Sequence, residues 1–209
     1  MLKKFKVLIV IASLAITLSL MSNTYSRYVA SSEGNVEIEF AKWQLLVNTV
    51  DVTSSATSNI SFEPVIESNA NVAQNKVAPS STGHFDIEID PTNVDVSFKY
   101  TIDLSIDNEN IPDLMITKYA ILPENYIEGN ALEFSNLVEG KISNVMNYAE
   151  GGFKKFTLRI YFQWFEGQTE TMNETMDDAA DTNVGYTAAT ENTTFAINAN
   201  INFEQYLGE

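Results

Sequence analysis

This 209-residue chain has one histidine and no cysteine, so its candidates for chemistry are that histidine and its many carboxylates. His84 stands between Gly83 and Phe85, where a strand is expected to begin. One histidine without cysteine cannot build a usual structural zinc site or supply the His-Glu-x-x-His motif of metalloproteases. No serine stands in the Gly-x-Ser-x-Gly elbow of the α/β-hydrolases. We interpret His84 as an ordinary surface or turn residue, and we expect no enzyme, no catalytic residue and no cofactor.

The other candidate for chemistry is an acidic cluster. Asp177, Asp178 and Asp181 lie close together, and Glu170 and Glu174 precede them. Oxygen ligands of this kind can hold calcium, but the spacing of an EF-hand loop is absent. We interpret the cluster as a solvated acidic loop and expect no metal site. A secreted hydrolase with paired carboxylates, as in glycosidases, stays as an alternative function.

The first 27 residues have the layout of a secretory signal peptide. Lys3, Lys4 and Lys6 precede an apolar run at residues 7–20, and small polar residues follow that run. The run is about 14 residues long, shorter than the roughly 20 residues of a membrane-spanning helix. We expect the signal peptide to end between residues 26 and 31. The mature protein is then secreted, with no stable membrane insertion after cleavage.

The charge of the chain argues against nucleic acid as a partner. Three of the 12 basic residues and none of the 28 acidic residues lie in the first 26 positions. The remainder therefore carries a net charge of −19. Such a chain repels phosphate backbones and anionic lipid surfaces, and its charge keeps it in solution after export.

The pattern of residues 28–209 predicts a single all-β domain. Apolar and polar residues alternate along residues 94–106, which is typical of a strand with one face in a core. A turn at residues 90–93 is expected to join this strand to its predecessor. Helical spacing is limited to two stretches, so we expect one or two short helices in connections. Many short strands predict an antiparallel β-sandwich. Further strand-like alternation occurs at residues 36–47, 85–89, 156–164 and 195–203, and the helical stretches are residues 132–148 and 171–182.

Three segments carry a resemblance to a known family. Residues 24–28 (Thr-Tyr-Ser-Arg-Tyr) are similar to the end of SipW-type signal peptides, although Val29 and Ala30 stand where an acidic residue is usual. Residues 78–85 resemble a Pro-Gly-x-x-Gly-x-Phe turn, with Ser80 replacing the first glycine. Residues 162–166 and 178–185 resemble the Trp-x-(Pro)-aromatic-Glu and Asp-x-x-Asp-Thr-x-x-Gly segments of clostridial biofilm-matrix proteins. The chain is thus similar to the TasA/camelysin group, and most to its BsaA-like branch.

The resemblance implies a jelly-roll-like sandwich that polymerises into fibres or pili of a Gram-positive biofilm matrix. The implied location is the extracellular matrix or the cell surface. The implied partners are further copies of the chain, other matrix subunits and a SipW-type signal peptidase. Camelysin-type members have been labelled metalloproteases, and the single histidine here gives that label no support.

The residues expected to carry polymerisation lie at 28–40, a segment that signal removal would free. Val36, Ile38 and Phe40 alternate with Glu37 and Glu39. A sheet edge has unpaired N–H and C=O groups, which a strand from a neighbour can satisfy. We expect the three apolar residues to form the inner side of a donor strand. Pairing of this strand within its own domain is the structural alternative, and a monomeric adhesin or ligand-binding sandwich is the functional one.

Overall fold

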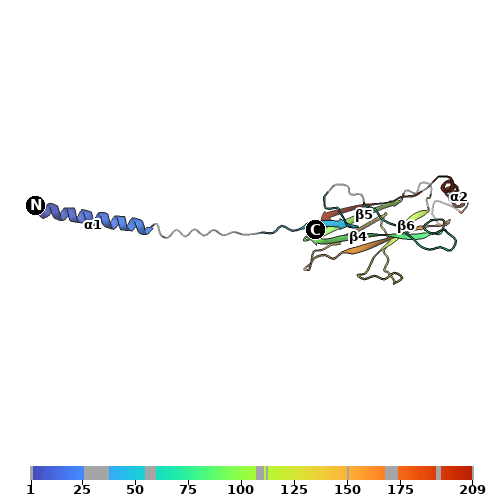
Figure 1. The fold of residues 1–209 in the computed structure, drawn as a ribbon, viewed down its shortest axis with the longest axis horizontal. Helices are drawn as coiled ribbons and strands as arrows, with labels where there is room; N and C mark the ends of the chain where they lie inside the picture. Colours follow the sequence, from blue (N-terminus) through green and yellow to red (C-terminus); the bar gives the residue numbers. More distant parts are fainter. Residues whose placement is uncertain are drawn as a thin grey trace. The chain divides into compact units, whose positions relative to one another are not determined.

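The computed structural model describes residues 2–25, 38–54, 60–106, 111, 113–149, 151–167, 174–191 and 194–208 (Figure 1). The chain divides into two compact units, Met1–Phe40 and Ala41–Glu209. The first unit contains the helix α1 (Leu2–Tyr25), which covers the apolar run expected to be a signal peptide. In the part of the chain that the structure describes, no helix combines the length and apolarity needed to cross a membrane.

The second unit consists of two antiparallel sheets and one helix. The larger sheet has the strand order β2-β1-β4-β8-β6, with the short β3 also paired to β4, and the smaller sheet has the order β7-β5-β9. This is the all-β, sandwich-like arrangement that the alternation of the sequence predicts. The elements are β1 (Trp43–Val47), β2 (Val50–Asp51), β3 (Val65–Ile66), β4 (Thr82–Val94), β5 (Phe98–Ile106), β6 (Leu114–Ile121), β7 (Lys141–Met146), β8 (Phe156–Trp164), α2 (Glu174–Thr190) and β9 (Ile197–Gln205).

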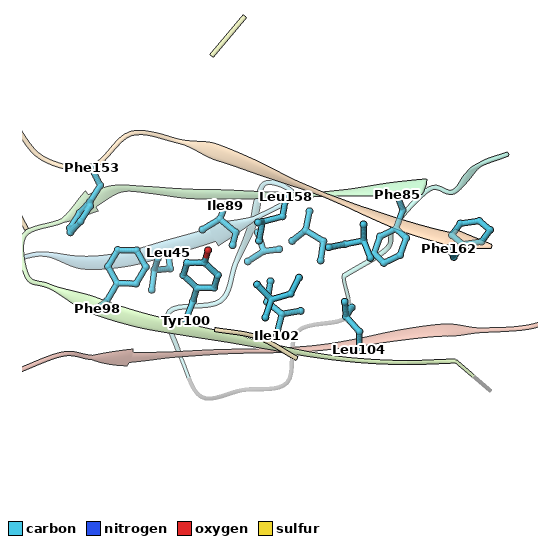
Figure 2. Close-up of a cluster of buried hydrophobic side chains, with 14 of the residues drawn as sticks. Leu45, Phe85, Ile89, Phe98, Tyr100, Ile102, Leu104, Phe153, Leu158 and Phe162 are labelled. Carbon is cyan, nitrogen blue, oxygen red and sulfur yellow. The ribbon is translucent and has the colours of Figure 1, made fainter. Parts of the chain in front are cut away.

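The core lies between the two sheets, and strict alternation along the strands builds it. Phe98, Tyr100 and Ile102 of β5 are fully buried, whereas the intervening Lys99 and Thr101 point away from the core. Figure 2 shows these side chains pointing toward those of the opposite sheet, which β4 and β8 supply. Burial of each large apolar side chain contributes about 1.5–3 kcal/mol, so this layer is the main source of stability. The labelled partners across the gap include Ile89, Leu158 and Phe162.

The turn expected at residues 90–93 is absent, because β4 runs through it to Val94. Pro91 has no N–H to donate, which normally excludes proline from a central strand. Here the pairing of β4 with β8 has ended at Ile89, and the register of β4 against β1 shifts between Asp90 and Asn93. The side chain of Asp90 accepts hydrogen bonds from the N–H and the hydroxyl of Thr92. The turn-like sequence therefore marks a β-bulge.

The two expected helices have different outcomes. Residues 132–148 contain no helix, and their second half is the strand β7. Residues 171–182 lie partly outside the described residues, and α2 extends from Glu174 well beyond them to Thr190. Helical spacing over residues 132–148 was thus overridden by pairing with β5, whereas the acidic stretch does form a helix.

We predict that Phe98→Ala lowers the free energy of unfolding by about 3–5 kcal/mol, because it removes a ring from the centre of the core. The ring lies 5.0 Å from that of Phe153 and 6.2 Å from that of Phe203. Thr101→Ala, on the opposite face of the same strand, should change stability by less than about 0.5 kcal/mol. Chemical denaturation of both variants measures the difference, and equal losses would show that the face assignment is wrong.

Candidate functional site

The predicted donor residues lie immediately before the sandwich. Val36 falls outside the described residues, and nothing structural can be said of it. Ile38 is 79% exposed and Phe40 is 94% exposed, and neither belongs to a helix or a strand. Burial of an apolar side chain of this size stabilises a protein by about 1.5–3 kcal/mol. Neither residue contributes this stabilisation while it is exposed. Two large apolar side chains are thus presented to solvent within three residues of the chain.

The outer strands of the two sheets differ in how well they are protected against pairing with another chain. Natural sheet edges are shielded by short strands, bulges, charges or covering segments. Among the described strands, β2 has two residues, β7 has six and begins with a lysine, and β6 has a register shift between Ile116 and Lys118. Ser135 also pairs with Tyr119 across the outer side of β6. These three edges are therefore poor templates for a further strand.

The fourth outer strand, β9, has none of these protections along most of its length among the residues that the structure describes. It is nine residues long, pairs with β5 without a register shift, and carries one charged residue, Glu204. The N–H of Tyr206 donates to the carbonyl of Ser97, which fixes the direction of hydrogen bonding along β9. Alternate residues then point their N–H and C=O groups away from β5, toward a side that no described strand occupies. These residues are Ile197, Ala199, Ile201 and Phe203.

The same four residues of β9 direct their side chains toward the core, and those side chains are only half-buried. The corresponding side chains of the neighbouring β5 are almost completely buried up to Leu104. The difference arises because β5 has a strand on both sides and β9 has a described strand on one side. A further strand beside β9 would therefore satisfy backbone groups and cover apolar surface at the same time.

An apolar groove of about 710 Å³ reaches the beginning of β9. Segment 60–66, β4, the end of β8 and α2 contribute to its walls together with β9. This volume falls in the range of small-molecule sites, so the groove also keeps the ligand-binding alternative open. Its apolar lining includes Phe62, Ile66, Phe85, Val184, Phe195 and Ile197.

A cluster of three aspartates lies where α2 meets the sandwich. Asp113 directly precedes β6, and Asp177 and Asp181 stand one helical turn apart in the first half of α2. One carboxylate oxygen of each aspartate lies within 4.8 Å of the others. Asp113 and Asp177 are each 1% exposed, and Asp181 is partly buried. At an effective dielectric constant of about 20, two charges 4 Å apart repel by roughly 4 kcal/mol, so full ionisation of the cluster needs a counter-charge.

The burial of these aspartates contradicts the expected solvated loop. Residues four apart share one face of a helix, so Asp177 and Asp181 both face the sandwich while Asp178 faces solvent. Sequence reasoning also missed Asp113, which is 64 positions before Asp177. No local pattern around Asp113 marks it, because only the packing of α2 against the start of β6 brings the residues together.

The hydrogen bonds of the cluster orient the carboxylates and leave two oxygens without a partner. Asp177 Oδ2 accepts a hydrogen bond from the Gly167 N–H, and Asp181 Oδ1 accepts one from Trp164 Nε1 at 3.1 Å. Asp113 Oδ2 and Asp177 Oδ1 are buried, and neither has a hydrogen-bond partner among the described residues. Buried acceptors of this kind are rare in native proteins and call for a proton, a water or an ion.

Burial raises the pKa of the Asp113 carboxyl to about 7, and the neighbouring carboxyl groups of Asp177 and Asp181 add to the shift. Burial and the charge of Asp177 also raise the pKa of Asp181. At neutral pH the Asp113 carboxyl is therefore poised between its protonated and its ionised form.

A second polar cluster, on the outer face of the large sheet, has a structural role. Arg159 is buried and binds Asp86 through Nε and Nη2, and it binds Glu128 through Nη1 at 2.7 Å. The hydrogen bond to Asp86 and the nearby negative charges raise the pKa of Arg159, so its guanidinium group stays charged at any ordinary pH. The arrangement attaches the segment around Glu128 to the sheet.

His84 lies on this outer face and is buried. The sequence had led us to expect an exposed surface or turn residue. His84 lies in β4, and its ring centroid is 5.6 Å from that of Tyr161. Burial lowers the pKa of His84, and the positive charge of Arg159 lowers it further, so the neutral imidazole is favoured. The expected strand start is confirmed, because β4 begins at Thr82, but the expectation of a surface or turn residue is wrong, because His84 is buried beside Tyr161.

No protein-family model matches the chain, and no curated protein matches it. The described residues define a structural class: a mostly β protein whose two antiparallel sheets form a sandwich-like domain, with the helix α1 before it and α2 within it.

We predict a specific pH dependence for Asp113→Asn. The carboxyl group has a higher pKa in the folded protein than in the unfolded chain, so its ionisation lowers the free energy of unfolding between about pH 4 and pH 7. Asparagine does not ionise, so the variant does not undergo this decrease in the free energy of unfolding. In metal-free buffer the variant should therefore gain stability relative to wild type as pH rises through this range, and the gain should level off above pH 7.

Urea denaturation at several pH values measures this gain. Asp178→Asn removes the same charge from the exposed face of the helix and serves as the control. A constant difference between Asp113→Asn and wild type from pH 4 to pH 8 would contradict the prediction.

Proposed function

We propose that this chain is a secreted structural subunit that polymerises into extracellular fibres. In this proposal, residues 28–40 of one copy pair as a strand with the open edge of β9 in the next copy. The observation that carries the proposal is that β9 is a long, regular and unprotected edge whose inward side chains are only half-buried.

The number of strands supports an incomplete sandwich. Leaving aside β2 and β3 of two residues each, the described residues form four strands in the large sheet and three in the small sheet. A strand added beside β9 would give two four-stranded sheets, which is the strand count of a jelly roll. We propose that the complete fold is jelly-roll-like and that each subunit receives its eighth strand from a neighbour.

The donor segment has the pattern that this site requires. With Ile38 and Phe40 turned toward the core, Glu37 and Glu39 face solvent. Val36 would be the third apolar residue of the inner face. Backbone pairing supplies affinity, and the apolar side chains set the register, because a slip of one residue would turn glutamates toward the core.

This contact joins different surfaces of the two copies, so it repeats head to tail and produces a filament wherever successive copies do not close into a ring. We infer that a SipW-type signal peptidase removes α1 and frees the donor segment after export. The partners in this proposal are further copies of the chain and other subunits of a biofilm matrix, and the location is the extracellular matrix or cell surface. The strong negative charge should slow assembly at low ionic strength.

The alternative is a monomeric adhesin or ligand-binding sandwich that uses the apolar groove of about 710 Å³. It differs from the fibre proposal in leaving the edge of β9 unpaired. It therefore predicts that no polymer forms at any protein concentration and that a ligand binds in the groove.

We predict that Ile38→Asp and Ala199→Pro each yield folded monomers and no fibres. The aspartate places a charge on the inner face of the donor strand. The proline removes the N–H of Ala199, which points to the open edge, so pairing of β9 with β5 is kept. Circular dichroism of the secreted proteins measures folding, and negative-stain electron microscopy measures fibres.

Each variant has a matched control. Glu39→Asp keeps the charge on the solvent side of the donor and should form normal fibres. Asn200→Pro removes an N–H that points to β5 and should destabilise the domain itself. Normal fibres from both Ile38→Asp and Ala199→Pro would refute the proposal, and an unfolded Ile38→Asp would place that strand in its own domain.

A further inference from the structure

The three aspartates where α2 meets the sandwich suggest a second property, independent of fibre formation. An acidic cluster alone is common on protein surfaces, and an aspartate in the first turn of a helix also favours the positive end of the helix dipole. Two further observations set this cluster apart. Asp113 and Asp177 are each 1% exposed, and each has one buried carboxylate oxygen without a hydrogen-bond partner among the described residues.

The charges around the cluster leave the carboxylates uncompensated. In the described part of the chain, the lysines and arginines that form ion pairs do so with other acidic residues. Gly167 donates a hydrogen bond to one oxygen of Asp177, and Trp164 donates one to one oxygen of Asp181. Neighbouring groups that hold a carboxylate in one orientation are typical of the supports around metal ligands.

We propose that Asp113, Asp177 and Asp181 together bind one calcium ion. Calcium takes carboxylate oxygens at about 2.3–2.6 Å, so two of its ligands lie at most about 5 Å apart. The three oxygens, which all lie within 4.8 Å of one another, fit around one such ion without a change of backbone. Magnesium usually keeps several waters and is held by one or two carboxylates, whereas this site offers three, and zinc prefers nitrogen and sulfur ligands.

The ion would act as a cross-link within the domain. It would join the start of β6, which Asp113 precedes, to the first turns of α2, which Asp177 and Asp181 supply. Trp164 at the end of β8 and the backbone of Gly167 just after it would hold the ligands in place. Without calcium the like charges of the three carboxylates would repel one another.

The test compares the thermal unfolding of the full chain and its Asp113→Asn variant at pH 7.5. In EDTA the variant should be the more stable protein, because it lacks one of the repelling charges. At about 10 mM calcium, roughly a hundredfold above a Kd of about 10⁻⁴ M typical of extracellular modules, the Tm of the wild type should rise by about 5–10 °C. The variant lacks one of the three carboxylate ligands and should bind calcium about a hundredfold more weakly, so its Tm should shift by only about 1–2 °C. Calcium should thus reverse the order of stability of the two proteins, which a purely structural role of Asp113 would not do.

Terbium luminescence provides a second readout that does not depend on stability. Terbium takes the same oxygen ligands as calcium, and the indole of Trp164 lies against Asp181. Excitation of tryptophan should produce terbium emission in the wild type and in Asp178→Asn, and calcium should compete it away more effectively than magnesium. Asp177→Asn should lose most of the emission.

The proposal is overturned if calcium shifts the Tm of wild type and Asp113→Asn equally. It is also overturned if terbium emission is the same in Asp177→Asn and Asp178→Asn. Either result would show that the three aspartates do not bind calcium together. Neither result would affect fibre formation, which is measured separately by microscopy.

Discussion

The structure depends on one constraint: each apolar sheet face must be covered by another layer, and each inner strand needs a partner on both sides. β5 satisfies both conditions, with β7 and β9 beside it and β4 and β8 across the core. β9 satisfies them on one side only, among the described strands. The open edge, the half-buried side chains and the proposed donor strand all follow from this one missing neighbour.

The alternation of the sequence was sufficient to predict the core of the fold. Phe98, Tyr100 and Ile102 lie inward as expected, because a period of two leaves one choice of face. The bulge at Pro91 was not predictable, since the same residues suit a turn, and only the end of pairing with β8 decides between them. The burial of His84 was missed for a related reason, because tertiary packing and not the local sequence covers this part of the outer face of the sheet.

Each candidate site likewise combines residues that a local sequence pattern reveals with residues that only the tertiary structure brings to it. Ile38 and Phe40 stand out in the sequence, but the edge that would receive them is a property of strand order and cannot be read from local patterns. Asp177 and Asp181 have helical spacing that the sequence displays, whereas Asp113 joins them only through tertiary packing. Local patterns therefore identified one partner of each proposed interaction and missed the other.

The central claim is that the donor segment of one copy pairs with β9 of the next. Ile38→Asp keeps an intact acceptor edge, and Ala199→Pro keeps an intact donor segment, so a mixture of the two proteins has one usable pairing. Light scattering after size-exclusion chromatography should show that each alone is monomeric and that the mixture forms a one-to-one dimer and nothing longer. A mixture that stays monomeric, or one that forms long polymers, would contradict the account.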